Sequence, residues 1–186
     1  METRIDNDGL ERQINITCVL YAVLSVVCLL VLQHFSWAPV QVRISEALCV
    51  AALFSKSAAP KLAAGCAVAN LIGMLIFGLW PAGLLDVVFG SLATFLGALW
   101  CYRFRENRAK ALFGFVLTNA LIVAAYLPFV AQGSGFYTIP FTDISFDGNY
   151  LAMYAFSIVT VGIGEAISVF ALGWPLSKLL FRKYSE

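Results

Sequence analysis

Four charged residues, with several amides and tyrosines, interrupt the long apolar stretches of this 186-residue chain. Charged side chains in apolar stretches of this length are costly when they face hydrocarbon, so they usually face a cavity and mark a functional site. Carboxylates accept hydrogen bonds and attract cations, whereas arginine and amide groups donate hydrogen bonds. The residues that could bind a ligand in this way are Arg43, Glu46, Asn70, Asp86, Asn119, Tyr126, Tyr154 and Glu165.

Glu165 is the strongest candidate in this set. It lies deep inside the last apolar stretch, and no Lys or Arg of the sequence lies at the same depth. A buried carboxylate without a partner must either take up a proton or find a cation or a donor. A cationic or donor-rich ligand would supply this partner, so we predict that Glu165 binds substrate.

The other candidates have structural interpretations that the sequence leaves open. Arg43 and Glu46 are three residues apart and could pair with each other on a helix. Asp86 could cap the start of its helix. Asn70 and Asn119 could form hydrogen bonds between membrane helices. The pairing of Arg43 with Glu46 is compatible with a binding role.

The composition shows what kind of fold must position these residues. The chain is 61% hydrophobic and 12% charged, whereas a soluble domain is roughly 45–50% apolar and about 25% charged. This disfavours a soluble enzyme and a disordered chain. The net charge of +1 provides no general attraction for nucleic acid. We predict an integral membrane protein of the all-α class, with one domain over residues 1–186.

Six apolar segments predict the helices. A membrane-spanning helix needs about 20 mostly apolar residues, and no alternation of the β-barrel kind is present. The second segment is too short to cross unaided, so either Val40 and Val42 extend it or it is buried inside the bundle. The predicted six-transmembrane-helix bundle has helices at about 14–32, 42–55, 62–79, 84–102, 111–131 and 150–181.

The distribution of basic residues predicts the orientation. With a cytoplasmic N-terminus, eleven of the 12 basic residues lie in inner loops and only Arg43 lies on the outer side, as the positive-inside rule requires. The inner residues are Arg4, Arg12, Lys56, Lys61, Arg103, Arg105, Arg108, Lys110, Lys178, Arg182 and Lys183. We expect a multi-pass protein of the cell membrane with both termini in the cytoplasm. The outer loop 132–149 is either a lid or a simple connector.

Motifs for catalysis are missing from the sequence. The five cysteines (Cys18, Cys28, Cys49, Cys66 and Cys101) have no CxxC spacing, and the single histidine, His34, cannot form an HExxH zinc site. There is no GxSxG motif and no GxxxxGK[ST] phosphate loop. We therefore expect no enzyme, no metal and no cofactor, and any ATP-driven step must be carried out by partner proteins.

Specific strings of the sequence resemble the QueT family, the substrate-binding S-components of energy-coupling factor (ECF) transporters for queuosine precursors. The strongest are PVQVRISEAL at 39–48 and GLLDVVFGSLA at 83–93. Weaker ones are GCAVAN at 65–70, NALIV at 119–123, GEA at 164–166 and LGWPL at 172–176. Together they touch five of the six predicted helices in the order of the family, so the resemblance covers nearly the whole chain.

The resemblance implies a six-helix subunit that binds a 7-deazaguanine base from outside. In the transport scheme of this family, the loaded subunit topples in the membrane on a shared transmembrane coupling subunit, driven by two ATPase subunits. S-components carry a pair of small residues of the AxxxA type in the first helix as their docking surface. The corresponding pair here is Cys18 and Ala22, which we expect on the surface of the first helix.

The candidate residues suit this substrate class chemically. A deazaguanine presents N–H and NH₂ donors on one edge, which a carboxylate accepts together, and an aminomethyl group adds a cation for a second carboxylate. Glu46, Asp86 and Glu165 are the candidate acceptors, and tyrosines could stack on the planar ring. Asn70, Asn119 or Arg43 could reach the carbonyl group of the base. Two alternatives stay open: another vitamin-like small molecule, and a structural membrane subunit without transport activity.

Overall fold

The computed structural model describes residues 7–32, 42–139 and 142–184. The predictions that involve Arg4, His34 and Val40 lie outside these described residues. Within them the chain is helical apart from turns and one isolated β-bridge between Thr138 and Ser145. The predicted all-helical class is therefore confirmed for the described part of the chain.

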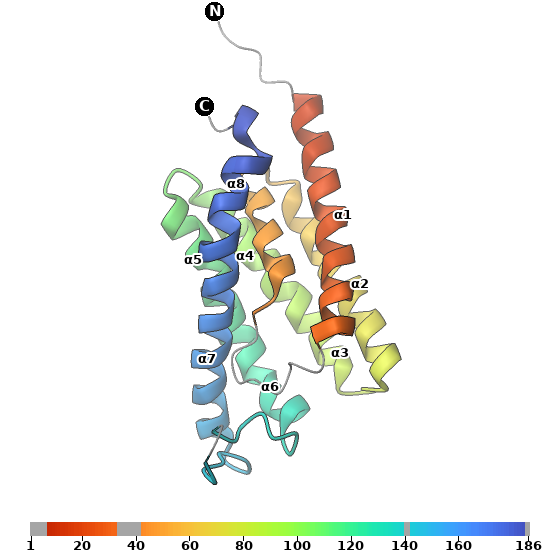
Figure 1. The fold of residues 1–186 in the computed structure, drawn as a ribbon, viewed down its shortest axis with the longest axis vertical. Coiled ribbons are helices and arrows are strands. Elements are labelled where there is room, and N and C mark those ends of the chain that lie inside the picture. The colour runs from red at the N-terminus through yellow and green to blue at the C-terminus, as the bar shows by residue number, and fades with distance from the viewer. Residues whose placement is uncertain (1–6, 33–41, 140–141, 185–186) are drawn as a thin grey trace, which may run out of the picture.

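Five helical segments are long and apolar enough to cross a membrane, and they form a bundle (Figure 1). Their bounds are Asn7–Val31, Ala58–Phe77, Gly83–Arg103, Arg108–Ala131 and Tyr150–Leu180. The first corresponds to α1 (Asn7–Leu32) and the second to α2 (Ala58–Phe77). They match five of the six apolar segments that the sequence predicts, and they support a multi-pass membrane protein.

The second predicted segment differs from a spanning helix. It forms η2 (Ile44–Leu53), a 3₁₀-helix of 10 residues. At a rise of about 2.0 Å per residue it is roughly 20 Å long, which is shorter than a hydrocarbon core of about 30 Å. Its side chains from Ser45 to Leu53 are all buried. Burial inside the bundle is thus what the structure shows for this segment, and six full spans are not confirmed.

Glycines on the neighbouring helices let the bundle close around α1 and η2. A Cβ atom added to Gly65 of α2 would lie 3.1 Å from Cβ of Ala22 on α1. A Cβ atom added to Gly173 would lie 2.9 Å from Cγ1 of Val50 in η2. Larger residues at these two positions would push the helices apart, so the glycines fix the close approach.

Each of the last three spans contains a π-helical turn. A π turn shifts the register of a helix and is frequent at functional sites. The three spans, in chain order, are α3 (Gly83–Leu85), η3 (Asp86–Gly90) and α4 (Ser91–Arg103); α5 (Arg108–Thr118), η4 (Asn119–Val123) and α6 (Ala124–Ala131); and α7 (Tyr150–Ala166), η5 (Ile167–Gly173) and α8 (Trp174–Leu180), followed by the short 3₁₀-helix η6 (Arg182–Tyr184).

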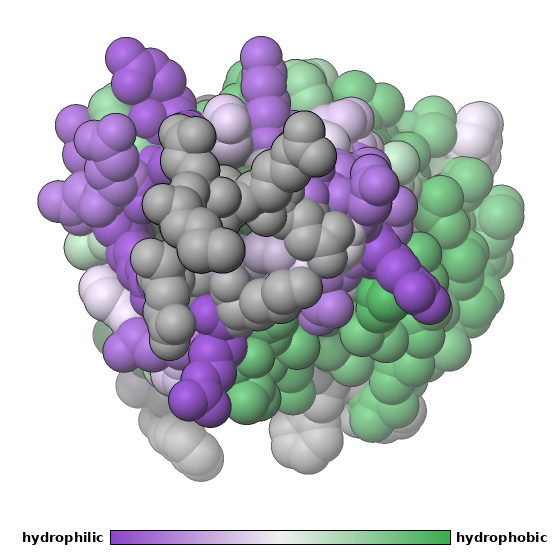
Figure 2. All heavy atoms as spheres, turned by 90° about the horizontal axis from the view of Figure 1, so that it is seen from above, coloured by the Kyte–Doolittle hydropathy of each residue, from purple (hydrophilic) through white to green (hydrophobic). Residues whose placement is uncertain are grey.

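The start of α1 and the end of α8 lie at the same end of the bundle (Figure 1). The turn between η2 and α2, which contains Lys56, and the turn between α4 and α5, which contains Arg105, lie at this end too. Figure 2, which views this end, shows that hydrophilic residues gather on it. Which side of the membrane it faces stays a prediction.

Candidate functional site

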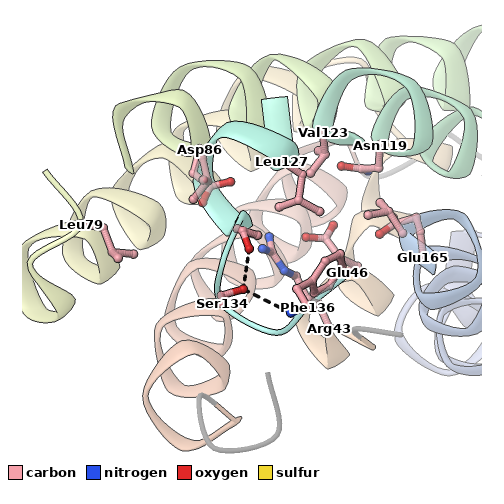
Figure 3. A pocket seen from close by; sticks show the side chains of 13 residues that line it. Arg43, Glu46, Leu79, Asp86, Asn119, Val123, Leu127, Ser134, Phe136 and Glu165 are labelled. Carbon is pink, nitrogen blue, oxygen red and sulfur yellow. Dashed lines mark hydrogen bonds between the residues drawn. The ribbon is translucent and has the colours of Figure 1, made fainter. Parts of the chain in front are cut away.

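A pocket of about 410 Å³ lies between η2, the three helices that contain π turns, and the loop after α6. Its volume falls in the range of roughly 300–1,000 Å³ that small-molecule sites occupy. Five of the eight candidate residues line it, and Figure 3 shows their side chains directed into the pocket from different elements. These five are Arg43, Glu46, Asp86, Asn119 and Glu165.

The local fold explains how the five residues meet. Arg43 directly precedes η2 and Glu46 lies in its first turn. Asp86 and Asn119 are the first residues of the π turns η3 and η4, and Glu165 lies in the last turn of α7. Because two of the π turns begin with a pocket residue, the shift in helix register is part of what directs these side chains inward.

Glu46 has protein donors on both of its carboxylate oxygens. The Tyr21 hydroxyl donates to Oε1 at 3.1 Å, and the Cys49 thiol donates to Oε2 at 3.1 Å. Glu46 is 4% exposed. Among the described residues it forms no ion pair with Arg43, although Glu46 and Asp86 are the carboxylates that attract Arg43 most strongly.

Asp86 is held by two of the candidates that do not line the pocket. The Tyr126 hydroxyl donates to its Oδ1 at 2.6 Å, and the Asn70 amide donates to its backbone oxygen at 2.9 Å. Asn70 thus forms the hydrogen bond between helices that its alternative interpretation predicts. The capping role of Asp86 is wrong, because α3 precedes this residue and the helix continues through it.

Asn119 leaves most of its amide group for the pocket. Its Nδ2 donates to the Phe115 backbone oxygen at 3.1 Å, which is a bond within its own helix. The alternative interpretation of Asn119 predicts a hydrogen bond between helices, and the observed bond lies within one helix instead. The second N–H and the amide oxygen remain able to bind a ligand.

Glu165 differs from the other acids of the pocket. It is 7% exposed, and its Oε1 is buried without any hydrogen-bond partner in the described part of the chain. The charged groups that act on it are Glu46, which repels it, and Arg43, which attracts it. An unsatisfied buried acceptor costs about 1–3 kcal/mol, so a ligand donor that reaches this carboxylate would stabilise the protein.

The sequence interpretation missed the uncharged wall of the pocket. This wall consists of Leu79, Val123, Leu127, Val130, Ala131, Ser134, Phe136 and Val161. Most of these residues are indistinguishable from other apolar residues of a span. The glycine-rich and aromatic composition of the loop 132–149 was the one signal that pointed to Ser134 and Phe136.

The described part of the loop 132–149 packs against α7. Phe136 packs edge-on against Tyr137, with ring centroids 5.0 Å apart, and against Phe156 of α7 at 6.0 Å. The Tyr137 hydroxyl lies 3.1 Å from Oγ of Ser157, and burial raises the pKa of Tyr137 so that it stays neutral. These contacts argue against a simple connector, and whether the loop acts as a lid stays a prediction.

Tyr154 is not brought together with the other candidates. It does not line the pocket, and its ring stacks on Tyr150 with centroids 6.2 Å apart and planes at 7°. Among the described residues, Phe136 is the one aromatic residue that lines the pocket. A stacking role for a tyrosine is therefore less well supported than one for Phe136.

The pair expected on the surface of α1 points inward. Cys18 is 5% exposed and Ala22 is partly buried, because α2 approaches α1 closely at Gly65. The surface position expected for Cys18 is thus wrong, and docking through this pair stays a prediction. All five cysteines are free, and the described residues contain no cluster of three or more His, Cys, Asp or Glu that could hold a metal ion.

Comparison with known proteins gives one match. A family model described as QueT transporter matches residues 13–182. No curated protein and no solved structure matches the chain.

Proposed function

Because this chain belongs to the QueT transporter family, we propose that it is the S-component of an ECF-type importer that captures a queuosine precursor from outside the cell. Membership of the family and the five apolar helices indicate a membrane transport protein with a non-enzymatic role. The proposal adds the substrate, the subunit role and the direction of transport.

The carboxylate of Glu165, which lines the pocket and has one oxygen without a hydrogen-bond partner among the described residues, is the observation that carries the proposal. A 7-deazaguanine presents adjacent N–H and NH₂ donors, and a carboxylate can accept both in a bidentate, charge-assisted pair. Burial excludes competing water, so this pair would be strong. The ligand thus supplies the donor that the protein lacks at this position.

The rest of the pocket suits the other parts of such a base. Arg43 and Asn119 line the pocket and bring N–H donors for its carbonyl group. Phe136, Val123 and Leu127 provide an apolar wall for the planar ring. An aminomethyl group would bring a cation into a pocket that holds three acids and one arginine, so the precursor we favour is 7-aminomethyl-7-deazaguanine.

The energy for import would come from partner proteins. The sequence contains no phosphate loop for ATP. We therefore propose that the chain works with a transmembrane coupling subunit and two ATPase subunits, and that toppling on the coupling subunit delivers the base.

Ligand binding by the purified full-length protein tests the proposal. A thermal-shift screen and titration calorimetry would compare 7-aminomethyl-7-deazaguanine, 7-cyano-7-deazaguanine, guanine and a set of vitamins. We expect the deazaguanines alone to raise the melting temperature, since only a molecule that binds the folded state does so. Stabilisation by a vitamin instead would assign another substrate, and no response to any compound would favour a structural subunit.

A further inference from the structure

Tyr21 of α1 lies behind the pocket, in contact with one of its acids. Its side chain is 0% exposed, and its hydroxyl donates to Oε1 of Glu46 at 3.1 Å while also neighbouring the Cys66 thiol. Tyr21 does not line the pocket itself. It therefore touches the site only through the carboxylate of Glu46.

Packing places the ring of Tyr21 independently of its hydroxyl. A Cβ atom on Gly65 of α2 would lie 3.2 Å from Cδ1 of Tyr21, so the ring fills the narrow space between α1 and α2. A phenylalanine would fill the same space. The hydroxyl is thus not required for packing, and its hydrogen bond orients the carboxylate.

The three acids of the pocket differ in whether a tyrosine hydroxyl donates to them. Tyr21 holds Glu46, and Tyr126 holds Asp86 in the same way at 2.6 Å. Within the described residues, no tyrosine is seen to hold Glu165 in this way, and its Oε1 has no hydrogen-bond partner. A carboxylate oxygen has two lone pairs, so the two held acids can still accept from a ligand, but only in the orientation that their tyrosines impose.

We propose that Tyr21 is a positioning residue of the binding site, which fixes the Glu46 carboxylate toward the ligand and makes α1 part of the site. The inference rests on the proposed function for the identity of the ligand. It adds a residue outside the pocket wall that determines how tightly the ligand is held.

A double-mutant cycle tests whether Tyr21 acts through Glu46. Calorimetry with 7-aminomethyl-7-deazaguanine would compare wild type, Tyr21→Phe, Glu46→Gln and the double variant. We expect Tyr21→Phe to weaken binding about 10-fold, because a hydrogen bond to a charged group is lost, and to have a clearly smaller effect in the Glu46→Gln background, where the hydroxyl faces a neutral acceptor. Tyr126→Phe is the matched control, and its effect should add to that of Glu46→Gln because it acts on Asp86.

A measurement without ligand separates this inference from the proposed function. Crystal structures of the ligand-free wild type, Tyr21→Phe and Tyr126→Phe compare the orientations of the carboxylates in the pocket. We expect the Glu46 carboxylate to turn from its wild-type orientation in Tyr21→Phe with Asp86 unchanged, and the Asp86 carboxylate to turn in Tyr126→Phe with Glu46 unchanged.

The outcomes are distinct. If the wild type binds no deazaguanine but the Glu46 carboxylate turns in Tyr21→Phe, the proposed substrate is wrong and the positioning role of Tyr21 stands. A Glu46 carboxylate that keeps its wild-type orientation in Tyr21→Phe overturns the positioning role. Additive effects of Tyr21→Phe and Glu46→Gln on affinity overturn it too, even where the protein binds the base.

Discussion

Glu11 and Glu165 are acids of the same bundle with opposite surroundings. Glu11, on α1, accepts hydrogen bonds from Ser55 at 2.9 Å, from Ser57 at 2.8 Å and from Lys61 at 2.9 Å. Its side chain is 43% exposed. Glu165 is 7% exposed, and its Oε1 has no hydrogen-bond partner in the part of the chain that the structure describes.

The difference separates a structural acid from a binding acid. Glu11 fastens α1 to the start of α2 with a complete set of donors, and water can replace any of them. Glu165 is buried where water cannot compensate, so its missing donor costs free energy in the empty protein. The rest of the fold offsets this cost in the empty protein, and a ligand that supplies the donor regains it.

The largest effect is expected from Glu165→Gln. The amide keeps the size of the side chain but cannot form a charge-assisted pair, so the affinity for 7-aminomethyl-7-deazaguanine should fall at least tenfold. The melting temperature of the empty protein should not fall, because the variant removes a buried acid that lacks a partner. Calorimetry and thermal unfolding in detergent measure the two quantities, and an unchanged affinity would remove Glu165 from the site.

A second variant gives Glu165 the kind of partner that Glu11 has in Lys61. Val161 lines the pocket four residues before Glu165, so Lys in its place lies on the same helix face. We expect Val161→Lys to weaken binding by about tenfold, since an internal ammonium competes with the ligand for the carboxylate. Val161→Met is the matched control for length without charge.

Calorimetry of the two Val161 variants decides whether charge or space matters. Val161→Met should weaken binding clearly less than Val161→Lys. Equal losses would mean that the pocket lacks room and that the free oxygen of Glu165 is not the reason for binding.

The sequence predicts the spans of this fold well and the irregular helices poorly. Five apolar segments can be predicted as spans from their length alone, because the thickness of the hydrocarbon core sets the length that a span needs. The 3₁₀ geometry of η2 has no such signature, since Ile44–Leu53 is apolar in either kind of helix. The π turns at Asp86 and Asn119 arise from how the helices pack, which no local pattern records.

The candidate site, too, contains residues that the sequence predicts and residues whose position depends on packing. Arg43, Glu46 and Glu165 could be predicted because a charge in an apolar segment is conspicuous. Phe136 could not be placed from sequence, because its position depends on how the loop folds onto Phe156 of α7. The inward position of Cys18 depends on the approach of α2, which spacing within α1 cannot reveal.

The smallest effect is expected from Glu11→Gln, and it tests the other half of the comparison. The variant loses the ion pair with Lys61 but keeps an acceptor for Ser55 and Ser57. Because both charged side chains are partly exposed, at 33% and 43%, the free energy of unfolding should fall by less than about 1 kcal/mol. The affinity for the base should not change, because no residue of this cluster lines the pocket.

Thermal unfolding at low and high salt, with Lys61→Met as the partner variant, measures the free energy of unfolding, and calorimetry measures the affinity. A loss of affinity as large as that of Glu165→Gln would show that the two acids belong to one functional unit, and the distinction between a structural acid and a binding acid would then fail.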